Sequence, residues 1–326
     1  MKTFPQVVED DRKMTRAEIV NLYEWPLVSI VTPSFNQAEF IEDTIRSVLE
    51  QDYPRLEYIV VDGGSTDGTI DILKKYHGKI HWVSEPDDGQ TNAINKGFLL
   101  AKGEILGWIN SDDFYLPGAI KTAITFLRNH PEFMMVHGDC QVIASNGSIK
   151  SVRKTADFGL DKLIGVDTIA QPTVLFRRQV LKMIGLLNER LEYVFDWEFW
   201  VRMGIKNLKT KHIPVVLAAF REHRESKTLS RKELFWQERF LVLGQIFSSA
   251  DTPVEIKSLE QRAFSGVFAS SAYFYLQHGK VRKFLVTLYK SVRMWPGILF
   301  QYNPFFVARA LWEVGSSWFR ALRFRV

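Results

Sequence analysis

The sequence predicts an α/β protein in which helices flank a mixed, mainly parallel sheet and a helical extension follows. Short apolar runs alternate with helical patterns over residues 27–109, and this alternation is typical of right-handed crossovers between parallel strands. The regular alternation of strand and helix patterns ends after Pro117, and no strand pattern remains from Ser230 onward. We therefore expect three parts: an N-terminal extension (1–26), an α/β domain (27–228) and a helical C-terminal region (229–326).

The composition indicates a globular protein of a reducing compartment. The chain has 326 residues with 46% hydrophobic and 24% charged residues. Its single cysteine, Cys140, excludes an intramolecular disulfide and a thiolate metal cluster. Residues 1–26 lack the apolar segment of a secretory signal, and no apolar stretch reaches the roughly 18 residues of a spanning helix. We expect a cytoplasmic location.

The first half of the α/β domain reads as four strands separated by three helices. Each predicted strand is a short, continuous apolar run, as expected where a strand is buried on both faces. The strands are expected at 27–32, 56–61, 80–83 and 104–109, and the helices at 38–51, 67–76 and 90–101. In such sheets, ligands bind beyond the carboxyl ends of the strands. The loops that follow these strands should therefore carry the chemistry.

The sequence pattern predicts further strands in the second half of the domain and helices in the extension. A helix is expected at 119–129, followed by strands at 134–137, 141–144, 148–153, 173–176, 211–214 and 216–220. Asn146-Gly147 is a hairpin signal before one of these strands. Helices are expected at about 231–248, 254–278, 280–293 and 304–323. Because no Gly/Ser-rich linker separates the two parts, we expect the helices to dock on the domain.

The loops after the first two strands combine polar residues with glycines. The first reads Thr32-Pro33-Ser34-Phe35-Asn36, and the second begins at Asp62 and continues Gly-Gly-Ser-Thr-Asp-Gly-Thr. A carboxylate at the end of a buried strand can accept a hydrogen bond from a base or ribose, and the glycines let the backbone approach a ligand. Asp62 could instead cap its strand, and Asp67 is expected mainly to cap the next helix.

The loop after the third strand leads into a helix that suits an anionic ligand. Gly89 and Gln90 stand at the expected helix start, with Asn92 and Lys96 about one turn further on. A helix N-terminus attracts phosphate, and a nearby cation strengthens that attraction. An ordinary capped helix start is the alternative.

The fourth strand runs straight into the acidic sequence Asn110-Ser111-Asp112-Asp113. Carboxylates at the end of a buried strand are costly unless a cation is held there. The usual cation is a divalent metal with oxygen ligands, which in turn holds a phosphate. The alternative is a solvated turn.

In their order and spacing, these motifs resemble the family 2 glycosyltransferases of the GT-A fold, a Rossmann-like α/β fold, over about residues 27–225. The resemblance implies transfer of a sugar from a nucleoside diphosphate donor, usually with inversion, and a Mn²⁺ or Mg²⁺ ion on the diphosphate. The donor contacts that it implies are Thr32, Pro33, Ser34, Asn36, Asp62, Gly89, Gln90, Asn92, Lys96, Asn110 and Ser111.

The resemblance also implies the metal ligands. The family's Asp-x-Asp motif aligns its second acid with Asp112, which makes this residue the expected ligand, with Asp113 in support directly or through water. The first acid of the motif is replaced here by Asn110. One negative charge is therefore missing from the family's pattern.

The acceptor half carries a candidate base and a basic loop. Asp196, in Phe-Asp-Trp-Glu, matches the family's catalytic Asp, although Phe195 replaces the preceding acid. Asp196 could instead be a helix N-cap, and Glu198 is expected to support the site or the fold. The loop at 220–228 resembles the family's Arg-x-His-x-x-Ser-Lys-Thr. It implies Arg221 and Lys227 as diphosphate contacts and His223 as a metal or phosphate ligand, with a solvated basic loop as the alternative.

The final segment suggests a surface partner. Residues 303–326 combine aromatic side chains with basic ones, as an interfacial helix does. Packing on the protein's own helices or in a homodimer is an equal alternative. The expected acceptor is a growing glycan or a lipid-linked glycan of surface polysaccharide biosynthesis, at the inner face of the cell membrane. No nucleic-acid-binding motif is present.

Two functions other than sugar transfer are alternatives for this sequence. A non-catalytic nucleotide-sugar-binding or scaffold protein is the main alternative, because Asn110 and Phe195 depart from the family's pattern. A nucleotidyltransferase would need a Gly-rich loop with Lys or Arg after the first strand, whereas this chain has Pro33-Ser34-Phe35-Asn36 there.

Overall fold

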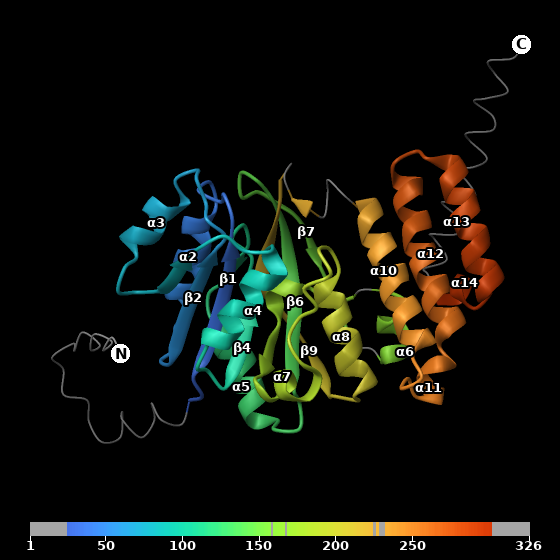
Figure 1. The fold of residues 1–326 in the computed structure, drawn as a ribbon, viewed down its shortest axis with the longest axis horizontal. Helices are drawn as coiled ribbons and strands as arrows, with labels where there is room; N and C mark the ends of the chain where they lie inside the picture. Colours follow the sequence, from blue (N-terminus) through green and yellow to red (C-terminus); the bar gives the residue numbers. More distant parts are fainter. Residues whose placement is uncertain (1–24, 158, 167, 224–225, 228–231, 302–326) are drawn as a thin grey trace, which may run out of the picture.

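The first four strands form the parallel part of one mixed sheet (Figure 1). The computed structural model describes residues 25–157, 159–166, 168–223, 226–227 and 232–301. The four strands are β1 (Val28–Ser34), β2 (Leu56–Asp62), β3 (His81–Ser84) and β4 (Ile105–Trp108). β1 pairs with β2 and β4, and β2 pairs with β3, all in parallel. These strands agree with the predicted ones to within two residues at each end.

The second half of the domain makes the sheet mixed. Its strands are β5 (Phe114–Tyr115), β6 (Met135–Ala144), β7 (Ile149–Arg153), β8 (Leu175–Arg177) and β9 (Thr210–Glu222). The order in the described part is β3-β2-β1-β4-β8-β6-β9-β5, with β7 paired to β6. β6 and β9 are parallel, while β8 runs antiparallel to both of its neighbours. The predicted mixed, mainly parallel α/β sheet is confirmed.

Helices cover both faces of this sheet. α2 (Ile41–Leu49), α3 (Thr69–Lys75) and α5 (Ala119–Asn129) pack on one face, and α4 (Gln90–Leu100) and α8 (Phe195–Ile205) pack on the other. Adjacent residues of one strand enter different cores, as Ile30 and Val31 do in β1. Burial on both faces explains why the strands are continuous apolar runs.

Two pairs of predicted strands are each a single strand. The runs 134–137 and 141–144 join as β6, and 211–214 and 216–220 join as β9. The register jumps from His137 opposite His212 to Asp139 opposite Val216, so β9 carries extra residues there. This irregularity accommodates Pro214, which cannot donate a hydrogen bond within a sheet. Sequence patterns interrupted by such a bulge read as two strands.

The helical region docks on the domain, as the missing linker predicts. It contains α10 (Lys232–Ser248), α11 (Val254–Lys257), α12 (Glu260–Gln277), α13 (Val281–Met294) and α14 (Ile298–Gln301). Val242 and Leu243 of α10 and Val267 of α12 belong to the same core as α8. The predicted helix at 254–278 is interrupted between α11 and α12, and the one at 304–323 lies outside the described residues.

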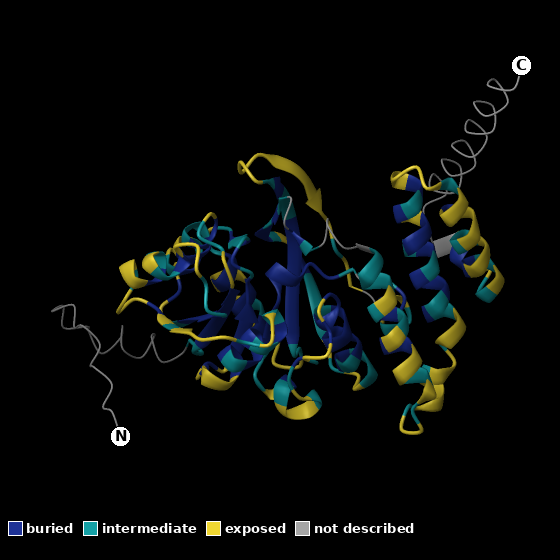
Figure 2. Cartoon of the chain, turned by 45° about the horizontal axis from the view of Figure 1, so that its top comes forward, coloured by how far each residue is buried: buried dark blue, intermediate teal, exposed yellow. Residues whose placement is uncertain are grey.

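Three short helices complete the described domain: α6 (Leu160–Leu163), the 3₁₀ helix η1 (Gln171–Thr173) and α7 (Gln179–Ile184). Figure 2 shows the central strands as the buried layer and strand β7, with the turn before it, as exposed. No helix in the described part of the chain is long and apolar enough to cross a membrane.

The sheet aligns the loops that carry the predicted motifs. Ser34 is paired with Asp62, and Asp62 is paired with Ser84, so three strands end side by side. α4 lies close to β1 because Gly97 has no side chain; a Cβ there would come within 2.3 Å of Val31. This close packing fixes the N-terminal end of α4 beside the ends of the strands.

Candidate active site

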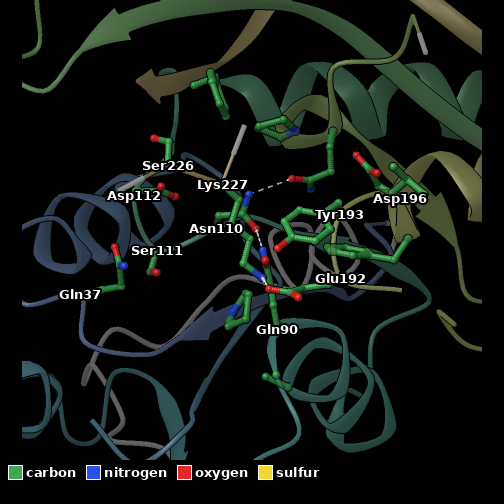
Figure 3. Close-up of a pocket in the computed structure, with 18 of the residues that line it drawn as sticks. Gln37, Gln90, Asn110, Ser111, Asp112, Glu192, Tyr193, Asp196, Ser226 and Lys227 are labelled. Carbon is green, nitrogen blue, oxygen red and sulfur yellow. Dashed lines mark hydrogen bonds and ion pairs between the residues drawn. The ribbon is translucent and has the colours of Figure 1, made fainter. Parts of the chain in front are cut away.

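A cavity of about 720 Å³ lies beyond the carboxyl ends of β1, β2 and β4 (Figure 3). Its walls come from the strand-end loops, the start of α4, the loop before α8, the end of β9 and helix α10. The predicted site residues that line it are Pro33, Ser34, Gly89, Gln90, Asn110, Ser111, Asp112, Asp196, His223 and Lys227. The cavity therefore brings residues from both halves of the domain together.

A chain of side-chain amides orients Asn110 at the cavity wall. Gln90 Nε2 donates to Asn110 Oδ1 at 2.8 Å, and Asn110 Nδ2 lies 3.4 Å from Gln171 Oε1. Gln171 Nε2 in turn donates to the carbonyl of Trp108 at 2.8 Å. Gln171 lines the cavity. It is absent from the predicted site residues, although the motif Gln171-Pro172 before a strand could have pointed to it.

Asp112 and His223 lie next to each other in the wall of the cavity. Asp112 Oδ2 and His223 Nε2 are 2.9 Å apart, and both residues line the cavity. A carboxylate oxygen and an imidazole nitrogen at this separation are suitable ligands for Mn²⁺ or Mg²⁺. Among the described residues, no group of three or more acidic, histidine or cysteine side chains gathers to hold a metal. Oxygens of a diphosphate and water would have to complete the coordination.

Asp113 points away from the cavity. It is fully buried, and its Oδ1 accepts the backbone N–H of Arg221 at 2.9 Å. Its Oδ2 lies 3.3 Å from Asn110 Nδ2. Burial, followed by the charge of Asp112, raises the pKa of the Asp113 carboxyl well above its usual value. Asp113 thus does not line the cavity, and its observed contacts brace the turn.

Arg221 lies beneath the acidic turn and does not line the cavity, contrary to its predicted contact with the diphosphate. The side chain is buried, and a buried guanidinium must be paired and hydrogen-bonded. It donates to the carbonyls of Asp112 and Ser145 and to the carboxylate of Asp43, each at 3.0 Å. It therefore ties β9 to the acidic turn and to α2.

Thr32 and Asp62, two predicted donor contacts, also lie outside the cavity lining. The Thr32 hydroxyl is 2.9 Å from the hydroxyl of Tyr58 in the core. Asp62 is fully buried, and its carboxylate accepts hydrogen bonds from the loop that follows it and from Ser84. It shapes the Gly-rich loop, as the strand-end alternative expects.

Asn36, Asn92 and Lys96 also lie outside the cavity lining. Asn36, with a φ of 52°, accepts the Thr66 N–H and so links the first two loops. Asn92 donates to Glu189 at 2.9 Å, and Lys96 pairs with Glu85 at 3.0 Å. The structure gives these three side chains contacts within the protein.

Asp196 stands in the first turn of α8, at the far side of the cavity from Asp112 (Figure 3). It is not the N-cap, which is Val194. Its Oδ1 accepts the N–H of Trp197 at 2.7 Å. Glu198, two residues on, is buried and bonded to Arg202 at 2.7 Å. Burial raises the pKa of Glu198, and Arg202 opposes that shift. Glu198 therefore stabilises the fold, as expected.

Comparison with known proteins decides the family. Residues 29–184 match the family described as Glycosyl transferase family 2. The chain is 30% identical over 205 residues to a PGL/p-HBAD biosynthesis glycosyltransferase of Mycobacterium bovis, an alignment that covers 60% of this chain and 77% of the relative. The chain belongs to glycosyl transferase family 2. For two further relatives, uncharacterized glycosyltransferases of Rickettsia, the chain spans 58% and 59% of their length.

Solved structures show that this family 2 chain has the GT-A fold. A mannosyltransferase from Pyrobaculum calidifontis, solved with GDP-Man and Mn²⁺, aligns with a TM-score of 0.61 at 18% identity and covers 90% of this chain and 80% of its own. S. aureus TarS residues 1–349, solved with UDP-GlcNAc, aligns with a TM-score of 0.56 at 18% identity, covering 80% and 89%. The predicted fold is confirmed.

The helical region contributes to the cavity of this family 2 chain. Phe235 and Arg239 of α10 line it, together with Glu192 and Tyr193. Lys227 Nζ is 3.5 Å from Glu192 Oε1, which joins the loop after β9 to the loop before α8. None of these four residues is among the predicted site residues. Their contacts depend on how α10 docks, which the sequence pattern does not specify.

Proposed function

We propose that the chain transfers a sugar from a nucleoside diphosphate donor, preferentially a UDP-sugar, to a hydroxyl of a glycan or lipid-linked glycan, with inversion at the anomeric carbon. The observation that carries this proposal is the single cavity lined by Asp112, His223 and Asp196. Among the acidic side chains that line it, Asp112 and Asp196 lie on opposite sides (Figure 3). An inverting transfer needs this separation, because the base and the leaving group must be on opposite faces of the sugar.

The donor side would hold the diphosphate through a divalent cation. Asp112 Oδ2 and His223 Nε2 would be the protein ligands of Mn²⁺ or Mg²⁺. When bound, such an ion neutralises the charge that develops on the departing diphosphate. The Mn²⁺ in the solved mannosyltransferase supports this assignment. Lys227, at the cavity wall, would add a further positive charge near the phosphates.

The acceptor side would use Asp196 as the general base. Its carboxylate takes the proton of the acceptor hydroxyl as that oxygen attacks the anomeric carbon. The new glycosidic bond forms while the bond between the sugar and the diphosphate breaks, and the nucleoside diphosphate leaves with the bonding electrons. A positioned carboxylate contributes about 10²–10⁴-fold to such a step.

The cavity wall is consistent with a sugar-bearing acceptor. Phe35, Tyr193 and Phe235 line it, and Phe35 is 60% exposed. Aromatic rings offer flat apolar surfaces with defined geometry, on which the apolar face of a sugar ring can lie. The M. bovis relative, a glycosyltransferase named for PGL/p-HBAD biosynthesis, supports transfer to an acceptor.

We further propose contact with the inner face of the cell membrane. Residues 303–326, the predicted contact, lie outside the described residues. On the described helix α13, Leu285, Val286 and Tyr289 are 42–64% exposed. Three basic residues are exposed on the same helix face: Arg282, Lys290 and Arg293. Such a face suits anionic lipid headgroups.

Sedimentation with phosphatidylglycerol vesicles tests the membrane contact. Loss of sedimentation on deletion of 303–326 would support the proposal, whereas a wild type that never sediments would refute it.

The test of the catalytic proposal is a panel of nucleotide sugars. Full-length protein is incubated with each donor and Mn²⁺, with and without glycan acceptors, and release of the nucleoside diphosphate is measured. Turnover of one donor, abolished by chelation, is the expected result. Binding of a donor without hydrolysis or transfer would favour the alternative of a non-catalytic nucleotide-sugar-binding or scaffold protein.

A further inference from the structure

One carboxylate from the helical region holds the loop that leads into α8. The loop Glu192–Val194 has three consecutive backbone N–H groups that donate to Glu238 of α10. The N–H of Glu192 is 2.8 Å from Glu238 Oε1, and those of Tyr193 and Val194 are 2.7 and 3.1 Å from Oε2. A carboxylate that accepts several backbone N–H groups makes strong, directional contacts.

α10 also contacts both sides of this loop. Glu238 and Arg239 follow Phe235 by three and four residues, which places both on its side of the helix. The rings of Phe235 and Tyr193 are 5.2 Å apart. The Arg239 guanidinium lies 4.9 Å from the ring of Trp197 in the first turn of α8. Helix α10 therefore contacts both this loop and the start of α8.

The position of the loop determines the position of Asp196. The N-cap of α8, Val194, has no side-chain capping bond of its own, and its backbone N–H is held by Glu238. Glu238 supplies a negative charge there, where the helix dipole favours it. Asp196 follows Val194 by only two residues. Catalytic geometry tolerates little displacement, because a shift of about 1 Å can cost about 10²-fold in rate.

We propose that Glu238 is a positioning residue for the transfer reaction, and that the helical region thereby completes the active site. This inference rests on the proposed role of Asp196. Glu238 does not line the cavity; it fixes the backbone that carries the base. The α/β domain without α10 would therefore bind donor but transfer sugar poorly.

The test compares Glu238→Ala and Glu238→Gln with a matched control, Glu233→Gln. Glu233 is on the same helix, but it pairs with Lys280 and Lys283 on the surface. Hydrogen exchange of the amides of residues 192–196, donor affinity and kcat are measured for each full-length variant. For Glu238→Ala we expect faster amide exchange in this segment, a 10- to 100-fold lower kcat and a donor Kd within about twofold of wild type. Glu238→Gln, which keeps one acceptor oxygen, should be intermediate.

Two results would overturn the proposal. One is unchanged amide exchange at 192–194 in Glu238→Ala. The other is faster exchange with an unchanged kcat per folded molecule, which would make the contact merely structural. A wild type that turns over no donor would count against the proposed function and not against the Glu238 contacts, because amide exchange needs no turnover.

Discussion

At the scale of single residues, Asp112 and Asp113 show how adjacent carboxylates acquire different roles. Asp112 faces the cavity beside His223, whereas Asp113 is buried under the turn and bonded to the backbone of Arg221. Only Asp112 is placed where a diphosphate-bound cation could reach it. The proposed metal site therefore has one carboxylate and one imidazole from the protein.

Substitution of Asp112 tests that metal site. Asp112→Asn keeps the shape but removes the charge, so we expect turnover to fall by at least about 100-fold. Calorimetry with UDP should show weaker binding in Mn²⁺ and little change in EDTA. Asp52→Asn is the control, because Asp52 is exposed and pairs with Lys121. Equal UDP affinity of Asp112→Asn and wild type in Mn²⁺ would remove Asp112 from the metal site.

Residue-level prediction succeeded where position along a strand determines direction. Asn110 and Asp112 follow β4, and both reach the cavity as expected. It failed for Arg221, whose basic character suggested a phosphate contact. Its actual partners come from α2 and from segments around residues 112 and 145, and such long-range contacts leave no local pattern.

At the scale of elements, α8 carries an ion pair between the buried Glu198 and the partly exposed Arg202. Arg202 bonds to Glu198 at 2.7 and 3.0 Å and donates to the carbonyls of Ile184 and Leu186. The pair therefore joins α8 to the end of α7. The pattern of charges four residues apart on a helix could be read from the sequence, whereas the two carbonyl contacts could not.

Removal of Arg202 should destabilise the protein. Arg202→Ala leaves Glu198 buried without its partner and two carbonyls without a donor, so we expect a loss of about 3 kcal/mol in the free energy of unfolding. Urea denaturation measures it. Arg46→Ala, which breaks an exposed pair with Asp43, should leave the midpoint nearly unchanged. Equal effects of the two substitutions would show that the pair in α8 has no special role.

β9 shows why strand boundaries were harder to predict than strand existence. Pro214 interrupts the apolar pattern and predicts a break, yet the chain continues as one strand of 13 residues. The partner strand β6 supplies room through Gly138, where a Cβ would meet the Val215 carbonyl at 2.5 Å. Only the pairing of the two strands reveals this accommodation.

At the scale of the whole molecule, a buried histidine couples stability to pH. His137 lies in β6, about 1% exposed, with its Nδ1 3.2 Å from the Thr155 hydroxyl. Burial, followed by the charge of His212, lowers the pKa of His137 from 6.5 to about 4. Between these values the unfolded chain binds a proton that the folded chain does not. Stability is therefore fully present above pH 6.5 and is lost as the pH falls toward 4.

The pH dependence of unfolding tests this coupling. Wild type should lose up to about 3 kcal/mol of unfolding free energy from this group between pH 7 and pH 4. His137→Asn should flatten the decline, and the exposed His130→Asn should not. Urea denaturation at pH 7, 6, 5 and 4 gives the curves. Parallel declines for His137→Asn and wild type would assign the acid sensitivity to other groups.

The architecture was the most predictable feature, because alternating strand and helix patterns extend over long segments. The docked position of α10 was not predictable, since it arises from apolar packing among α8, α10 and α12. The cavity wall formed by Phe235 and Arg239 and the contacts of Glu238 follow from that docking. The part of the site that could not be predicted from the sequence is thus the part formed by contacts between distant segments.

The most direct test of the account is sugar transfer by Asp196→Asn. With the active donor and Mn²⁺, we expect transfer to fall by about 10²–10⁴-fold while calorimetry shows UDP affinity close to that of wild type. Asp161→Asn, in the surface pair with Arg262, serves as the control and should keep wild-type transfer. Wild-type transfer by Asp196→Asn would contradict the assignment of the base and, with it, the proposed mechanism.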